Sequence, residues 1–132
     1  MRARLRRNCR VQHVCSVLVI DNDHAYRAAL TEALHVAPDL RVVAAASTVQ
    51  EGLALAASLR PDLVIVDVRM PDGGGPVVAR QLSRSLPDMA ILAISVHSDA
   101  EHQREMINAG ADAYIVKGGP IEDLLATLRA LC

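Results

Sequence analysis

Five short apolar runs alternate with five amphipathic stretches, and this alternation constrains the fold more than any other feature of the chain. Several runs are apolar at nearly every position, which is typical of strands buried on both faces of a parallel sheet. The runs predict strands over residues 16–20, 40–45, 63–66, 90–94 and 113–116. The intervening stretches predict helices over 24–36, 48–59, 75–85, 99–109 and 120–131.

Residues that favour helix starts stand in front of several of these stretches. Asp23 and Asp99 can cap the first and fourth helices, and Pro120 suits the first turn of the fifth. Ser47 stands three residues before Gln50, which predicts a capping pair at the second helix. Five successive βα units with right-handed crossovers build a doubly wound sheet. We therefore expect one α/β domain, a (βα)5 fold with a five-stranded parallel sheet.

Composition and charge narrow the function classes. At 132 residues the chain fits one domain, and its 52% of apolar residues without Phe or Trp predict an aliphatic core. A formal net charge of −1 gives no field that would attract nucleic acid or a membrane surface, so we expect neither as a direct partner. Five arginines crowd the first ten residues. We interpret 1–15 as a basic, flexible tail and 16–132 as the domain.

The three cysteines, Cys9, Cys15 and Cys132, show no ligand spacing and are odd in number. They predict neither a disulfide framework nor a zinc site. Free thiols suit a reducing cytosol. No apolar run is long enough to cross a bilayer, and the run near residue 15 does not match a secretory signal. We expect a cytoplasmic protein.

Polar side chains follow four of the five predicted strands. They are Asp21, Asn22 and Asp23 after the first strand, Asp67 after the third, Ser95 after the fourth and Lys117 after the fifth. Ligands of doubly wound sheets bind outside the carboxyl ends of the strands, where the strand order switches direction. One such Asp is more often a turn or cap residue. Four coincident strand ends indicate a shared site.

The residue types at these ends suit phosphoryl chemistry. Two converging carboxylates repel each other unless a cation lies between them, and oxygen ligands match Mg²⁺. Lys117 is the only lysine among fourteen Lys and Arg residues. A compact ammonium reaches into a narrow site where a guanidinium cannot. The alternative explanation is that a single lysine among many arginines arose by neutral drift in composition. Asp67 then serves as nucleophile, while the metal, Ser95 and Lys117 hold the phosphoryl oxygens. The product is an acyl phosphate.

Four segments, VLVIDND, DLVIVDVRMPDGGG, ILAIS and AGADAYIVK, resemble in order and separation the motifs of response-regulator receiver domains. The resemblance covers about residues 17–131 and implies a CheY-like, flavodoxin-like fold in which a sensor histidine kinase phosphorylates Asp67. By position, it implies a metal site from Asp21, Asn22, Asp67 and the backbone carbonyl of Arg69, a switch hydroxyl and aromatic in Ser95 and Tyr114, and the family lysine in Lys117.

The function implied by the resemblance is a two-component signalling switch and not a turnover enzyme. Phosphorylation would move Ser95 and Tyr114 and so reshape the surface formed by the last two helices and the fifth strand. The segments HAYRAAL, PDLRVV and MPDGGGP are similar to receivers of LuxR-type regulators. This similarity implies transcription regulation through an output domain or partner protein outside this chain, and it allows a homodimer.

Departures from the family pattern keep alternatives open. Asn22 replaces one acid of the usual pair, which predicts weaker Mg²⁺ binding, and Gly118 replaces a common proline. A degenerate receiver that acts as a phosphorylation-independent interaction module is therefore the alternative function. A phosphoester hydrolase is disfavoured because Arg69 stands where such enzymes carry a second acid. His97 is a candidate residue on the phosphate side of the site, but we interpret it as an exposed loop histidine.

Overall fold

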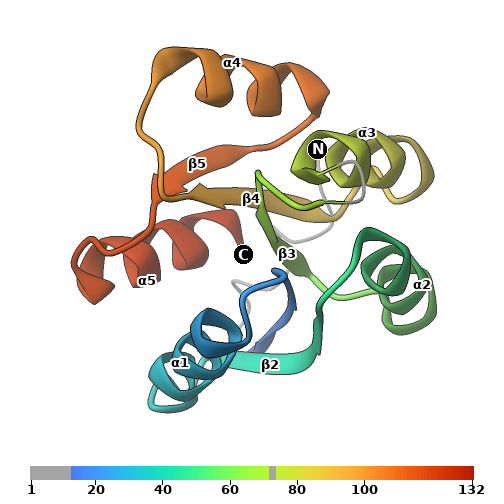
Figure 1. Ribbon diagram of the computed structural model, residues 1–132. Coiled ribbons are helices and arrows are strands. Elements are labelled where there is room, and N and C mark those ends of the chain that lie inside the picture. Colours follow the sequence, from blue (N-terminus) through green and yellow to red (C-terminus); the bar gives the residue numbers. More distant parts are fainter. Residues whose placement is uncertain (1–12, 72–73) are drawn as a thin grey trace.

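The computed structural model of the chain describes residues 13–71 and 74–132. Strands and helices alternate along this part of the chain (Figure 1). The strands are β1 (Cys15–Ile20), β2 (Leu40–Ala46), β3 (Leu63–Asp67), β4 (Ala90–Ser95) and β5 (Ala113–Val116). The helices are α1 (His24–His35), α2 (Val49–Leu59), α3 (Gly74–Ser85), α4 (Ala100–Ala109) and α5 (Ile121–Leu131).

All five strands are parallel and lie in the order β2-β1-β3-β4-β5, which confirms the predicted (βα)5 fold. The chain builds one side of the sheet with β2 and the other side from β3 onward, so the strand order switches between β1 and β3. Ile20 is in register with Val66. The next residues, Asp21 and Asp67, therefore leave the sheet side by side at this point.

Helices cover both faces of the sheet, with α1 and α5 on one face and α2, α3 and α4 on the other (Figure 1). Leu34 of α1 and Leu128 of α5 belong to one buried cluster. Leu82 of α3 and Met106 of α4 belong to the second. The core is aliphatic, as the composition predicted. Within 13–71 and 74–132, no helix is long and apolar enough to cross a membrane.

Each predicted strand and helix agrees with the structure to within one residue at either end. Asp23 and Asp99 cap α1 and α4, as predicted. The cap predicted for α2 was wrong by one position. Thr48 is the N-cap and accepts a hydrogen bond from Glu51 N, while the Glu51 carboxylate reaches back to Ser47 N at 2.9 Å. An acidic side chain forms this capping pair and the amide of residue 50 does not.

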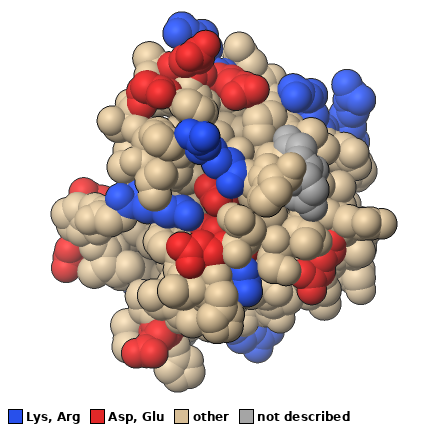
Figure 2. Space-filling view, in the orientation of Figure 1, with Lys and Arg blue, Asp and Glu red and all other residues tan. Residues whose placement is uncertain are grey.

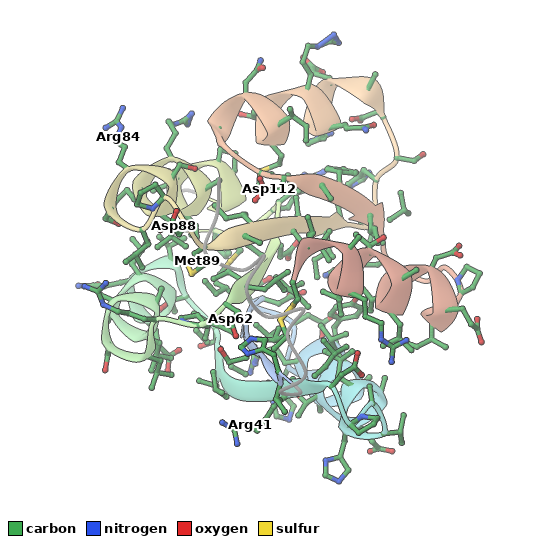
Figure 3. The ribbon with its side chains drawn as sticks, turned by 180° about the vertical axis from the view of Figure 1, so that it is seen from behind. Arg41, Asp62, Arg84, Asp88, Met89 and Asp112 are labelled. Carbon is green, nitrogen blue, oxygen red and sulfur yellow. A yellow bond between two sulfur atoms is a disulfide. The ribbon has the colours of Figure 1, made fainter. Side chains whose placement is uncertain are left out.

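Polar residues at the opposite, amino edge of the sheet have structural partners. Figure 3 shows this edge, where Asp62 and Asp112 precede β3 and β5. One Asp62 oxygen, Oδ2, accepts from both the backbone N and the hydroxyl of Ser16, at 3.0 and 3.1 Å. Asp112 Oδ2 accepts from Ile91 N at 2.8 Å. These carboxylates satisfy strand-end N–H groups, which is the usual role of a polar residue beside a sheet.

The expectation of unpaired cysteines was wrong. Cys15, the first residue of β1, forms a disulfide with Cys132, the residue that follows α5. The two cysteines are 117 residues apart, and only the docking of α5 beside β1 brings them together, so no local spacing could signal the pair. Cys9 and most of the predicted tail over 1–15 lie outside the described residues.

Candidate functional site

The carboxyl ends of the strands bring charged residues from distant parts of the chain to one face of the molecule. Asp21 follows β1, Asp67 ends β3, Ser95 ends β4 and Lys117 follows β5. Figure 2 shows acidic and basic side chains meeting near the middle of this face. These four residues were expected at one edge of the sheet, and the strand order places them there.

Lys117 connects the two carboxylates of the site. Its Nζ lies 2.7 Å from Asp21 Oδ2 and 3.7 Å from Asp67 Oδ2. The side chain of Lys117 is only 11% exposed and that of Asp21 is fully buried. Buried charges are stable only when they are paired, so the ammonium compensates two carboxylates that would otherwise repel each other.

The Asp67 carboxyl is held in an environment that resists its ionisation. Burial raises the pKa of Asp67, the negative charge of Asp21 raises it further, and the hydrogen bond from Arg69 N and the charge of Lys117 oppose that rise. The N–H of Arg69 donates to Asp67 Oδ1 at 3.2 Å. Two carboxylates thus share one ammonium. The three groups together keep a net negative charge, which favours binding of a further cation.

Asp21 presents an incompletely satisfied oxygen to the site. Its Oδ1 accepts a hydrogen bond from Asp23 N at 2.8 Å. Its Oδ2 is buried and pairs with Lys117 at 2.7 Å, but among the described residues it has no aligned hydrogen bond. A buried carboxylate oxygen in this condition is suited to a metal ion.

The donors at this edge fit a hard divalent cation that keeps several waters. They are carboxylate oxygens of Asp21 and Asp67, the exposed amide of Asn22 and a backbone carbonyl in the loop after β3. Within 13–71 and 74–132, no three His, Cys, Asp or Glu side chains lie together as a ready metal cage.

Ser95 and Tyr114 meet at the backbone of His97. Ser95 is fully buried, and its Oγ accepts from His97 N at 3.1 Å. The hydroxyl of Tyr114 donates to the carbonyl of His97 at 2.7 Å. Lys117 N donates to the carbonyl of Ser95 at 2.7 Å, which ties the end of β4 to the end of β5. The hydroxyl, the aromatic and the lysine are therefore joined through one loop.

Sequence reasoning missed two neighbours of the site. The ring of Tyr26, three residues beyond the α1 cap, has Lys117 Nζ 4.4 Å from its centroid, a cation–π contact. His97 is half-buried and not the exposed histidine that was expected: its Nε2 lies 2.7 Å from Arg69 Nη1, and its ring stacks on His102. The sequence contains one local signal for the Tyr26–Lys117 contact, which is the position of Tyr26 in the first turn of α1 beside Asp21. It contains none for the contact between Arg69 and His97.

Two glycines beside this site stand where another residue would change the backbone. A Cβ on Gly75, in the first turn of α3, would lie 2.7 Å from the carbonyl oxygen of Asp67, so a side chain there would displace the Asp67 end of β3. Gly118 has a φ of +89°. Proline, whose φ is fixed near −65°, cannot adopt this conformation. The glycine after Lys117 therefore specifies a different loop from the one that proline would form.

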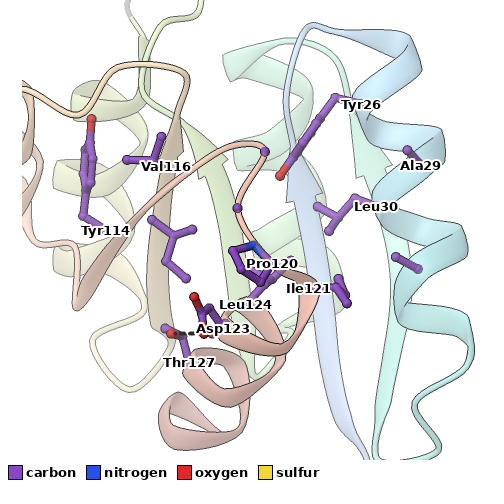
Figure 4. Close-up of a pocket in the computed structure, with 14 residues that line it drawn as sticks. Tyr26, Ala29, Leu30, Tyr114, Val116, Pro120, Ile121, Asp123, Leu124 and Thr127 are labelled. Atoms are coloured by element: carbon purple, nitrogen blue, oxygen red, sulfur yellow. Dashed lines mark hydrogen bonds between the residues drawn. The ribbon is translucent and has the colours of Figure 1, made fainter.

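A cavity of about 540 Å³ lies beside the site, between α1, β5 and α5. Figure 4 shows Tyr26 and Leu30 on one wall, with Pro120 and Leu124 facing them. Tyr26 thus contacts Lys117 and also borders this cavity. Residues 118–120, in the loop after Lys117, also line the cavity.

Comparisons with known proteins agree with this geometry. The chain is 34% identical to the response regulator GacA of Pseudomonas aeruginosa over 86% of its length, and 33% identical to the nitrate/nitrite response regulator protein NarL of Escherichia coli over 89%. It covers 53% and 55% of these proteins, so it spans about half the length of the curated relatives it matches. The structure of chemotaxis protein CheY4 from Vibrio cholerae superposes with a TM-score of 0.83 at 27% identity, covering 90% of this chain and 99% of that one.

The match at family level spans the whole fold. Residues 17–129 match the family described as response regulator receiver domain. This range begins in β1 and ends in α5, so it contains all the residues that converge on the site. The chain belongs to the family of response regulator receiver domains.

Proposed function

We propose that this receiver domain accepts a phosphoryl group on Asp67 from a sensor histidine kinase and passes the signal to an output domain or partner protein. The observation that supports this most is the position of Lys117 Nζ, 2.7 and 3.7 Å from oxygens of two buried carboxylates at the carboxyl edge of the sheet. As a receiver domain, the chain is a signalling switch and not a turnover enzyme.

The proposed reaction forms an acyl phosphate. An oxygen of Asp67 forms a bond to phosphorus while the bond between phosphorus and the donor's leaving group breaks. Asp21, Asn22, Asp67 and the carbonyl of Arg69 are the residues that would hold Mg²⁺, which when bound offsets charge on the phosphoryl oxygens. Receiver domains typically bind this ion.

Lys117 and Ser95 hold the phosphoryl oxygens in this proposal. Lys117 needs only to exchange part of its contact with Asp21 for a phosphoryl oxygen, because it already lies between the two carboxylates. Ser95 Oγ accepts from His97 N, so its own proton remains free for donation to a phosphoryl oxygen. These two donors act where negative charge increases.

The output step runs through the loop that joins β4 to α4. A shift of Ser95 toward a phosphoryl group alters its bond to His97 N, and the carbonyl of His97 holds the hydroxyl of Tyr114. The change would reach the surface of α4, β5 and α5, where Ile107, Val116 and Ile121 are exposed. In this proposal, a second copy of the chain, forming a homodimer, or a transcription-regulating output domain binds this surface.

We place the protein in the cytoplasm, where such kinases act.

Phosphorylation by a small-molecule donor tests the proposal. The chain is incubated with acetyl phosphate with and without Mg²⁺, its intact mass is recorded, and the modified residue is mapped after borohydride reduction of the acyl phosphate. We expect one phosphoryl group, on Asp67, only when Mg²⁺ is present. An unmodified mass under all conditions would favour the alternative, a phosphorylation-independent interaction module, for which Asn22 is the supporting observation.

Restoring the second acid should strengthen metal binding. Asn22→Asp adds a full negative charge beside Asp21 and Asp67, and we expect Mg²⁺ affinity, measured by calorimetry, to rise about tenfold, or about 1.4 kcal/mol. The exposed position of Asn22 limits the gain through solvent screening. Asn108→Asp is the matched control, because it adds the same charge on the exposed face of α4 near its last turn. Equal gains in both variants would show a nonspecific effect of net charge.

A further inference from the structure

The disulfide lies at the edge of the sheet opposite the phosphorylation site and joins the first strand to the end of the last helix. The Cα atoms of Cys15 and Cys132 are 6.1 Å apart, within the usual range for bonded cysteines. Cys15 is 2% exposed, whereas Cys132 is half-buried. Cys132 is therefore the more accessible residue of the pair.

Other contacts hold the same two segments together without the disulfide. Cys15 N donates to the carbonyl of Asp39 at 2.9 Å, and the carboxylate of Asp39 accepts two hydrogen bonds from Arg129, at 2.7 and 3.0 Å. Asp39 thus connects β1 to α5 with no sulfur involved. Leu128, fully buried one turn before Cys132, anchors the same end of the helix.

We propose that Cys15 and Cys132 form a thiol–disulfide exchange site, whose oxidised form clamps the end of α5 to β1 and whose reduced form keeps the fold but leaves that end held by noncovalent contacts alone. The co-reactant is a low-molecular-weight disulfide of the glutathione type. In a reducing compartment such as the proposed cytoplasm, disulfides are mostly transient and redox-sensing, and a half-buried cysteine paired with a buried one suits that use.

The exchange proceeds in two balanced steps. The Cys132 thiolate attacks one sulfur of the small disulfide, so a mixed disulfide forms and one small thiolate leaves. The Cys15 thiolate then attacks the Cys132 sulfur, which closes the protein disulfide and releases the second small thiolate. Overall, two protein thiols and one small disulfide become one protein disulfide and two small thiols, and the small disulfide is the species reduced.

The clamp acts on the helix that begins beside the proposed phosphorylation site. Lys117 is separated from the start of α5 only by the loop 118–120, while Cys132 lies at the far end of the same helix. A covalent bond at that end restricts how far α5 can shift when Lys117 changes partners. This link to signalling and the reducing compartment rest on the proposed function; the exchange reaction itself does not.

The test follows thiols and not phosphorylation, so its failure is separate from failure of the proposed function. Cys9→Ser protein, which keeps only the Cys15 and Cys132 thiols, is equilibrated in glutathione buffers of varied ratio, quenched, alkylated and weighed intact. We expect a reversible passage from two alkylated thiols to none, with Cys15 and Cys132 in one cross-linked peptide and the same far-ultraviolet circular dichroism in both forms.

Three results would overturn the inference: a stable glutathione adduct on Cys132 with Cys15 still alkylated, disulfide-linked dimers, or a reduced form that loses its circular dichroism. Hydrogen exchange gives a second measurement. Amides of 124–132 should exchange faster, by about tenfold, in reduced protein than in oxidised protein, the change expected when local opening is eased. Cys132→Ser should match the reduced protein under both conditions, and a redox response that persists in this variant would contradict the assignment.

Discussion

Asp67→Asn is expected to abolish phosphoryl uptake and, in a separate measurement, to raise the melting temperature of the protein. The amide cannot form the acyl phosphate, so uptake from acetyl phosphate should fall below detection. The substitution also removes a charge that burial and Asp21 disfavour. We expect the melting temperature of the metal-free protein to rise by about 4 °C, the change that about 1 kcal/mol produces in a domain of this size.

The pH dependence of this gain follows from the direction of the pKa shift. Because the pKa of Asp67 is raised in the folded state, the folded protein binds this proton more tightly than the unfolded chain does. Stability is therefore lost as pH rises from the unfolded pKa through the folded one. Asp67→Asn does not undergo this loss, so its advantage should be full at neutral pH and should vanish in acid below the ordinary carboxyl pKa.

Asp39→Asn is the matched control because its carboxyl has the opposite shift. The hydrogen bond from Arg129 lowers the pKa of Asp39, so loss of that charge should not stabilise the protein. Phosphoryl uptake by this variant should equal that of the wild type, since Asp39 lies at the amino edge of the sheet near Cys15. A stabilised Asp39→Asn protein, or a destabilised Asp67→Asn protein, would refute the charge argument.

The fold was predictable from the sequence because each strand carries its own signal. Runs such as 63–66 are apolar at every position, and helix caps such as Asp23 and Asp99 fix where the next element begins. The strand ends were predictable for the same reason: once the sheet is parallel, residues just past its apolar runs must share an edge. Asp21, Asp67 and Lys117 were identified in this way.

Contacts between segments far apart in sequence were not predictable by that reasoning. The Cys15–Cys132 bond depends on where α5 docks, and the Tyr26 ring meets Lys117 only because α1 and the loop after β5 flank the same strand ends. The Arg69–His97 contact joins two loops whose separation is set by sheet register. Periodicity and spacing describe one element at a time, so they contain no information on such pairs.

Lys117→Met should have the second largest effect, a fall of about 100-fold or more in the rate of phosphorylation, as expected when a preorganised donor to a charged oxygen is lost. It should also lower stability by about 3 kcal/mol, because Asp21 and Asp67 then remain buried without their ammonium. Lys117→Arg should not restore the rate, since the guanidinium is too wide for a space bounded by two carboxylates and the Tyr26 ring.

A double variant separates the chemical loss from the loss of stability. Asp21→Asn in the Lys117→Met background removes one of the two uncompensated charges, so the melting temperature should recover most of its fall. The phosphorylation rate should remain low, because neither the ammonium nor the Asp21 carboxylate is present to hold metal or phosphoryl oxygens. If the rate recovered together with the melting temperature, Lys117 would act by keeping the fold intact and would have no direct part in phosphoryl transfer. At restored stability, a rate well below that of Asp21→Asn alone, which keeps the ammonium, would assign that part to Lys117, acting from its position between Asp21 and Asp67.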